Sequence, residues 1–341
     1  MYKIAIAGAS TLLGKELKDA VSESVLAAAT FTLLDEDDAL GQLDQVGDEI
    51  TFVQAIDPDS FEHVDFTFFC GSEDLTRRHW QQALRAGSTV LDLSGALDRE
   101  PGVLFRAPWL ESRAGAPDLF TPAVVPAHPA AIALGLLLEP LQQVSPLRLA
   151  SATMLAPASE FSRGAMDELH QQTVSLLSFQ AIPRAIYDAQ AAYNLLAGFG
   201  DSAKISLTAL TSRIQRHYDA LGGGRWPLLG LQAIAAPVFH GHTFSIAVEF
   251  ERPVEVSIIE DALSGEHVEL ILEDTDSPSN LAATGQNGIL ARVRPVQDGR
   301  NPTQASQLWL WAASDNLRLY AQNAVECALE LRKLRPQGKV Q

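Results

Sequence analysis

The stretch that decides the fold is YKIAIAGASTLLGKELKDAVSES, residues 2–24. Its first part, residues 2–8, is an apolar run that predicts a buried strand, and residues 12–24 predict a helix. A turn over residues 8–14, with a glycine at each end, joins the two. Strand, glycine turn and helix in this order are typical of the first unit of a parallel sheet that binds a dinucleotide.

The same alternation continues through the first 95 residues. Strands are predicted over residues 31–37, 65–71 and 88–95, and a helix over residues 75–87 that ends at Gly87. Alternating strands and helices predict a doubly wound parallel sheet of the Rossmann type, in an α/β protein.

The pattern changes after residue 130. Helices are predicted over 163–177 and 204–221, and strands over 147–155 and twice within 230–250. Further strands are predicted over 254–263, 267–274 and 288–296, with a possible intervening helix. A last amphipathic helix, residues 316–334, is expected to pack on the first domain. We therefore expect a dinucleotide-binding domain over 1–130 with 316–341, and an α+β substrate and dimerisation domain over 131–315.

Composition excludes several classes of partner. The 341 residues include 42 acidic and 25 basic side chains, so the net charge of −17 repels nucleic acid and anionic membranes. Two cysteines imply no disulfide framework and fit a reducing compartment. No signal peptide and no apolar stretch of about 20 residues is recognised, so we expect a cytoplasmic protein with no membrane partner.

The glycine turn has two interpretations. Gly8 and Gly14 have the spacing of the outer glycines of a pyrophosphate loop, but Thr11 stands where a third glycine lets the backbone approach the phosphates. The turn is either a phosphate loop or a tight turn without a ligand. At the end of the second strand, Asp35 or Glu36 suits a ribose 2′-hydroxyl and repels a 2′-phosphate, which favours NAD over NADP; the alternative is a solvated acidic loop.

Seven stretches, in order, resemble motifs of the aspartate-semialdehyde dehydrogenase family, and they span essentially the whole chain. They are GASTLLG (8–14), FFCGSE (68–73), LRAG (84–87), DLSGALD (92–98), RGAMDELHQQT (163–173), PVFHGHTFSI (237–246) and SDNLRLYAQNAV (314–325). The resemblance implies the two-domain fold, a homodimer formed by the second domain, and a place in amino-acid biosynthesis. It also implies binding of NAD or NADP by Gly8, Ser10, Thr11, Leu12, Gly14, Glu36, Cys70, Gly71 and Asn323.

Members of this family reduce aspartyl phosphate through a cysteine thioester, with a histidine as acid and base. The resemblance aligns the cysteine with Pro129, the thiol-orienting glutamine with Met154, the substrate-carboxylate arginine with Ala235 and the phosphate arginine with Asp98. An arginine that grips the 2′-phosphate aligns near Asp38. Of the main catalytic set only the histidine remains, as His242.

The closer resemblance is therefore to the dehydrogenase-like paralogous branch, the Usg-type proteins, which keep the fold and lack the chemistry. We expect a pseudoenzyme in which His242 is a relic acid/base residue. The alternative is an active NAD(P)-dependent aspartate-semialdehyde dehydrogenase that forms or reduces aspartyl phosphate.

A few residues have two interpretations. Cys70 is either a relocated nucleophile or a small buried apolar residue, whereas Cys327 is expected in the core. His240 and His242 could form a three-histidine metal site with His128, but we expect no metal. Arg213 and Arg216 either line the site or lie on the surface.

Overall fold

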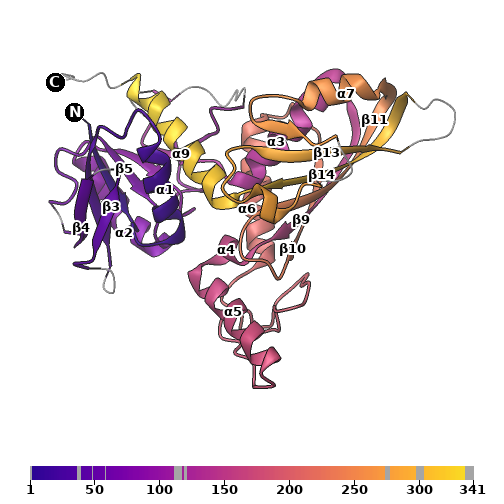
Figure 1. The fold of residues 1–341 in the computed structure, drawn as a ribbon. Coiled ribbons are helices and arrows are strands. Elements are labelled where there is room, and N and C mark those ends of the chain that lie inside the picture. The colour runs from indigo at the N-terminus through magenta and orange to yellow at the C-terminus, as the bar shows by residue number, and fades with distance from the viewer. Residues whose placement is uncertain are drawn as a thin grey trace. The chain divides into compact units, whose positions relative to one another are not determined.

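The computed structural model describes residues 2–36, 40–47, 49–57, 59–110, 117–118, 121–272, 277–296 and 303–334 (Figure 1). The chain divides into two compact units, residues 1–127 with 320–341 and residues 128–319. The domain limits expected from the sequence, near residues 130 and 316, stay a prediction.

The first unit is a doubly wound α/β sheet, as expected. Its sheet has the order β3-β4-β2-β1-β5-β6-β8-β7, and every neighbouring pair is parallel except β3 and β4. The strands are β1 (Lys3–Ala7), β2 (Thr30–Asp35), β3 (Leu43–Val46), β4 (Glu49–Ala55), β5 (Phe66–Phe69), β6 (Thr89–Asp92), β7 (Leu104–Arg106) and β8 (Ala123–Pro126).

Helices cover both faces of this sheet because side chains alternate along each strand. Ile4 and Ile6 of β1 point to one face, where they share a core with α1 (Leu12–Ser22) and with the part of α9 (Asn316–Arg332) that follows Leu319. Ala5 and Ala7 point to the other face, which is covered by α2 (Glu73–Arg85). The C-terminal helix thus packs on the first unit, which confirms the prediction from its apolar stripe.

An ion pair fixes the C-terminal helix to this sheet. Arg106, at the end of β7, holds both carboxylate oxygens of Glu330 on α9, and its Nε lies 2.7 Å from one of them. The hydroxyl of Tyr320 also donates to the carbonyl of Leu93, at 2.9 Å. A bidentate arginine–carboxylate pair is among the stronger side-chain interactions, so the end of the chain is firmly fixed here.

The second unit contains a mixed sheet of order β10-β9-β11-β14-β13-β12 (Figure 1). Only its outer pairs, β10 with β9 and β12 with β13, are parallel. The strands are β9 (Leu147–Ala156), β10 (Leu229–Ala235), β11 (His242–Glu255), β12 (Val268–Leu270), β13 (Ile289–Pro295) and β14 (Gln304–Ser314).

One face of the second sheet is covered by helices α3 (Pro129–Val144), α6 (Leu207–Gly222) and α7 (Val256–Leu263). The short helices α4 (Ala158–Phe161) and α8 (Asn280–Ala283) lie near the ends of strands β9 and β14. Helix α5 (Arg163–Leu177) has a separate small core with residues 186–205.

One prediction for the second half was wrong, and another is confirmed only in part. Residues 254–263 were expected as a strand, but β11 ends at Glu255 and Val256–Leu263 form helix α7. Within that helix the buried residues Ile259 and Leu263 are four apart, which is a helical spacing. The prediction for residues 267–274 is only partly covered, since β12 spans Val268–Leu270 and residues 273–276 lie outside the described residues.

Within the part of the chain that the structure describes, no helix is both long enough and apolar enough to cross a membrane.

The close approach of two turns in the first unit generates a stability prediction. Gly8 has φ +89°, and a Cβ there would lie 2.3 Å from the backbone nitrogen of Gly71. Gly87 has nearly the same φ, +86°, but a Cβ there would meet open space. We expect Gly8→Ala to lower the free energy of unfolding by about 3 kcal/mol or more, because it adds a backbone clash to the left-handed strain.

The matched control Gly87→Ala carries the strain alone and should cost about 1 kcal/mol. Both values come from urea unfolding followed by circular dichroism. Equal losses for the two variants would mean that the contact between the turns does not constrain the fold.

Candidate functional site

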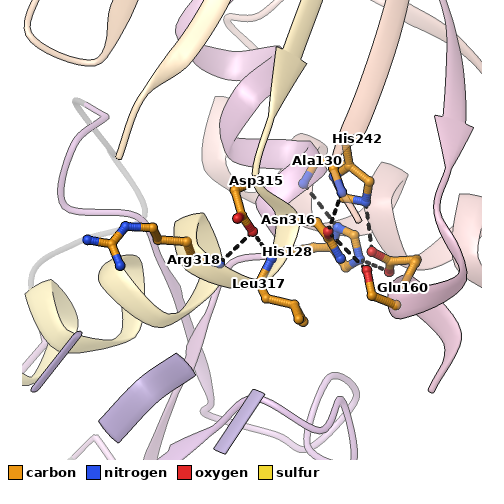
Figure 2. A network of polar contacts seen from close by, with 10 residues as sticks. His128, Ala130, Glu160, His242, Asp315, Asn316, Leu317 and Arg318 are labelled. Carbon is orange, nitrogen blue, oxygen red and sulfur yellow. Dashed lines mark hydrogen bonds and ion pairs between the residues drawn. The ribbon is translucent and has the colours of Figure 1, made fainter. Parts of the chain in front are cut away.

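The second unit contains a buried cluster of two histidines and a glutamate, His128, Glu160 and His242 (Figure 2). Nε2 of His128 lies 2.8 Å from one carboxylate oxygen of Glu160, and Nε2 of His242 lies 2.7 Å from the other. The two imidazole rings stack, with centroids 6.0 Å apart and 20° between their planes. One carboxylate therefore bridges two imidazoles.

Three different elements bring these side chains together. His128 is the N-cap of α3, directly after β8, and Pro129 begins the helix with the φ that the first turn requires. His242 is the first residue of β11 and follows Gly241, whose φ is +85° and whose Cβ would lie 2.9 Å from the carbonyl oxygen of Asn280. Only glycine fits that turn.

Helix α4 positions Glu160 beside His128 and His242. Its first two amides, of Ala158 and Ser159, donate to the carbonyls of Val238 and Phe239, at 2.9 and 3.0 Å. These carbonyls belong to the segment just before β11, so α4 is held beside the start of that strand.

Asn316 joins the turn at Gly241 to helix α4. Its Oδ1 accepts from the amide of Gly241 at 3.1 Å and from the hydroxyl of Ser159 at 3.2 Å. Asp315 accepts the amides of Leu317 and Arg318 and so caps the start of α9 (Figure 2).

The hydrogen bonds assign a neutral tautomer to His128. Its Nδ1 accepts from the amide of Ala130 at 3.2 Å, so the ring proton is on Nε2 and is donated to Glu160. The backbone amide of His128 donates to Nδ1 of His217, at 2.9 Å, and His217 is completely buried. His242 also has its Nε2 on Glu160, whereas its buried Nδ1 has no hydrogen-bond partner among the described residues.

The environment shifts two pKa values in the cluster. Burial lowers the pKa of His128, and electrostatic interactions with Arg213 and His242 lower it further. The carboxylate of Glu160 raises the pKa of His128 but does not outweigh these effects. Burial alone would raise the pKa of Glu160, but His128 and the hydrogen bonds from both imidazoles outweigh it, so this pKa lies well below its usual range. At neutral pH Glu160 is therefore a carboxylate that lies between the two rings.

The structure also locates the residues that the family resemblance aligned with catalytic positions. Pro129 is the first residue of α3, beside His128. Met154, on β9, is completely buried, and Ala235 ends β10 with 4 % of its surface exposed. Asp98 follows β6 and is buried, whereas Asp38 lies outside the described residues. The charge of Arg213 acts on His128, and both Arg213 and Arg216 are partly buried.

The glycine turn of the first unit is tightly packed. Thr11 is the N-cap of α1: its Oγ1 accepts from the amide of Gly14 at 2.9 Å and lies 2.8 Å from the carbonyl oxygen of Gly8 and 3.1 Å from that of Cys70. Its side chain therefore points back onto the turn. The amides of Leu12 and of the next residue belong to the first helical turn and have no intrahelical partner, as an anion site requires.

The two acidic residues after β2 have different partners. Asp35 accepts the amide of Ser10, at 2.8 Å, and also its hydroxyl, so it braces the glycine turn. Glu36 forms an ion pair with Arg78 on α2, and both side chains are exposed. Glu36 is therefore the carboxylate left for a ligand at this strand end.

Cys70 and Asn323 are buried in the first unit. Burial raises the pKa of the Cys70 thiol, and Asp92 and Asp35 raise it further, which disfavours the thiolate of a nucleophile. Asn323 donates to the carbonyl of Arg106 at 3.1 Å, and its Oδ1 has no partner among the described residues. Cys327 is completely buried, in line with the prediction of a core residue.

The three-histidine metal hypothesis finds no support. His240 lies before β11, in the turn that ends at Gly241, and not on a strand with His242. Among the residues that the structure describes, no group of three or more histidine, cysteine or acidic side chains has a geometry suited to a metal ion.

Comparison with known proteins decides the family. Residues 3–130 match the family model "Semialdehyde dehydrogenase, NAD binding domain", and residues 138–319 match "Semialdehyde dehydrogenase, dimerisation domain". The chain belongs to the semialdehyde dehydrogenase family. The resemblance drawn from seven motifs is thereby confirmed, as is the two-domain fold class.

Full-length relatives extend this family match. A USG-1 protein homolog from Azotobacter vinelandii is 30% identical over 333 residues, covering 95% of this chain and 96% of its own. An aspartate-semialdehyde dehydrogenase from Rickettsia bellii is 24% identical over 338 residues, and the match covers 97% of this chain and 98% of the Rickettsia protein. The solved structure of a probable aspartate-semialdehyde dehydrogenase from Pseudomonas aeruginosa superimposes with a TM-score of 0.85 at 28% identity. The superposition covers 97% of this chain and 98% of the Pseudomonas chain.

Two residues of the site were missed from the sequence, Glu160 in the cluster and His217 beside it. A signal for Glu160 existed, since SATMLAPASE aligns with a family stretch that ends in glycine, and an acid there is a large change. His217 lies within a helix with nothing in its neighbours to single it out. Its role follows only from the position of α6 against the start of α3.

The shifted pKa values predict acid sensitivity. The pKa of His128 is lowered in the folded state, so below about pH 6.5 the unfolded chain binds a proton that the folded chain does not, and stability falls. The lowered pKa of Glu160 acts in the same direction below about pH 4.3. We expect the melting temperature to fall between pH 7.5 and 5.5, and less steeply in His128→Asn, which retains a helix-capping side chain.

His170→Gln, at an exposed position on α5, is the control and should melt with the wild-type pH profile. An unchanged slope in His128→Asn would show that His128 does not carry the acid sensitivity.

Proposed function

We propose that this chain is a non-catalytic semialdehyde dehydrogenase homologue, which has lost the thioester chemistry and retains a dinucleotide-binding domain. The observation that carries the proposal is Pro129 at the first position of α3, beside the His128–Glu160–His242 cluster, where the family resemblance requires the nucleophilic cysteine. Proline has no nucleophilic atom.

Other features support the loss of acyl transfer. Cys70 and Cys327 are both buried, and burial raises the pKa of each thiol. The distal nitrogen of His242 is hydrogen-bonded to Glu160 and is not available to a substrate. Covalent catalysis, proton transfer and charge stabilisation each contribute orders of magnitude to such a reaction.

The first unit fits a nicotinamide dinucleotide. Leu12 lies in the first turn of α1, where the amide groups suit a pyrophosphate, whereas the amide of Gly14 already donates to Thr11. The close approach of Gly8 to Gly71 leaves no room for a side chain at Gly8. The buried Oδ1 of Asn323, which has no partner in the described part of the chain, suits an amide donor such as a nicotinamide carboxamide. A bound nicotinamide supplies hydride transfer, and these residues would hold and orient it.

We propose NAD as the preferred form. Asp35 is occupied by Ser10, so Glu36 is the acid that would accept a ribose hydroxyl, and its negative charge disfavours a 2′-phosphate. Arg78 forms an ion pair with Glu36 and weakens this discrimination, because its positive charge offsets part of the negative charge of the carboxylate.

The alternative proposal is an active NAD(P)-dependent aspartate-semialdehyde dehydrogenase. It is favoured by the names of relatives such as the Rickettsia bellii enzyme, and it would require a nucleophile other than residue 129. Fold likeness alone does not decide between the two proposals.

We further propose a homodimer that uses the uncovered face of the second sheet. Residues 138–319 match the dimerisation domain of the family. On that face Trp309 of β14 is 50% exposed and lies between Ala247 of β11 and Arg294 of β13 in the strand register. An exposed tryptophan on a flat sheet face is typical of an interface.

The test of the function is turnover with the purified wild-type chain. With aspartate semialdehyde, phosphate and NAD or NADP, we expect no absorbance of reduced cofactor above a heat-denatured blank. The same preparation should bind NADH more tightly than NADPH in a fluorescence titration.

Turnover that is lost in His242→Ala would contradict the proposal and make Cys70→Ser the next variant. Binding of neither cofactor would leave the loss of chemistry standing but remove the retained dinucleotide site.

The dimer is tested by Trp309→Glu, which places a charge in the proposed interface. We expect the wild type to have the mass of two chains by light scattering at micromolar concentration, and the variant to have the mass of one. Val25→Glu, at an exposed position of the first unit, is the control and should stay dimeric. A monomeric wild type would end the proposal.

A further inference from the structure

We infer that Glu160 is a built-in ligand: its carboxylate fills an anion site in which His128 and His242 are arranged to bind the carboxylate of a small organic acid. The inference rests on the proposed loss of acyl-transfer chemistry and deepens it, because it says what now fills the site.

The geometry is that of a bidentate carboxylate site. Two Nε2–H groups, on rings only 20° from parallel, each donate to a different oxygen of one planar group, at 2.8 and 2.7 Å (Figure 2). Paired donors that meet both oxygens of a carboxylate give strong and specific recognition. The same arrangement would hold the carboxylate of acetate or of a small amino or keto acid.

Burial makes an anion necessary at this position. The side chains of His128, Glu160 and His242 are exposed by only 2, 8 and 0%. Away from water, a donor without an acceptor costs considerable free energy. If the carboxylate of Glu160 were absent, two buried N–H groups would be left without acceptors, and an anion from solution would satisfy both.

The two donors are held independently of Glu160. His128 is fixed through Ala130 and His217, at the start of α3. His242 is fixed by the register of β11, where it lies opposite Ser314 of β14. Truncating the glutamate side chain should therefore empty the site without dispersing the residues that form it.

An orienting role for Glu160 fits the geometry less well. A carboxylate that orients a histidine for proton transfer leaves the second ring nitrogen free for the substrate. Here that nitrogen is Nδ1 of His242, which is completely buried and, among the described residues, has no partner; the same holds for the hydroxyl of Ser314 across the strand pair. The nitrogen at the tip of the ring is the one that Glu160 occupies.

The test is replacement of the built-in carboxylate by a free one. Glu160→Ala is melted in increasing sodium acetate, with sodium chloride and acetamide at matched concentrations as controls. We expect a melting temperature that rises by a few degrees with acetate and not with either control, because a ligand that binds only the folded state stabilises it. Glu160→Gln, which keeps the side chain in place, and the wild type should show no such rise.

A Glu160→Ala variant that melts cooperatively, with no more response to acetate than the wild type, would overturn the inference. So would a variant that stays unfolded at every acetate concentration while Glu160→Gln folds, because the site would then need the volume of the side chain and not its charge. Turnover by the wild type contradicts the proposed function, whereas these outcomes contradict only the built-in ligand.

Discussion

A carboxylate buried away from water must be paired, and in this protein that requirement joins three separate elements. Glu160 can remain charged in the interior only because His128 and His242 both donate to it. The start of α3, the short helix α4 and the start of β11 are thus held at one point. Breaking such an arrangement by removing one partner is strongly destabilising, whereas its net contribution when intact is small.

The first unit is organised by a different constraint, the close approach of two backbone turns. Gly8 and Gly71 meet with no space for a side chain at Gly8, and Asp35 and Thr11 satisfy the polar groups of the turn from within. The turn is therefore formed by the protein alone. A ligand at the start of α1 would find the loop already in place, which reduces the entropy lost on binding.

Family membership and chemistry are separate questions for this chain. Family matches cover residues 3–130 and 138–319, so the scaffold is that of the semialdehyde dehydrogenases. The proposed loss of chemistry rests on a few side chains: proline at residue 129, a glutamate at residue 160 and apolar residues at 154 and 235. A fold tolerates such changes because packing and not reactivity holds it together, and function depends on the site.

Local patterns alone determined much of the architecture. The run and turn of residues 2–24, the helix over 163–177 and the strand over 147–155 were all predictable, because each depends on a side-chain period within one segment. The hairpin of β3 and β4 was not predicted, and residues 254–263 were assigned to the wrong class. In both cases the deciding contacts come from neighbouring strands and helices.

The sequence also located Pro129 and His242, because the motifs around them are contiguous. Only the tertiary structure brought Glu160 between His128 and His242, which lie 32 and 82 residues away from it along the chain. No local pattern records that a carboxylate has two imidazole partners. The partners are set by the packing of α3, α4 and β11, and burial then makes their hydrogen bonds obligatory.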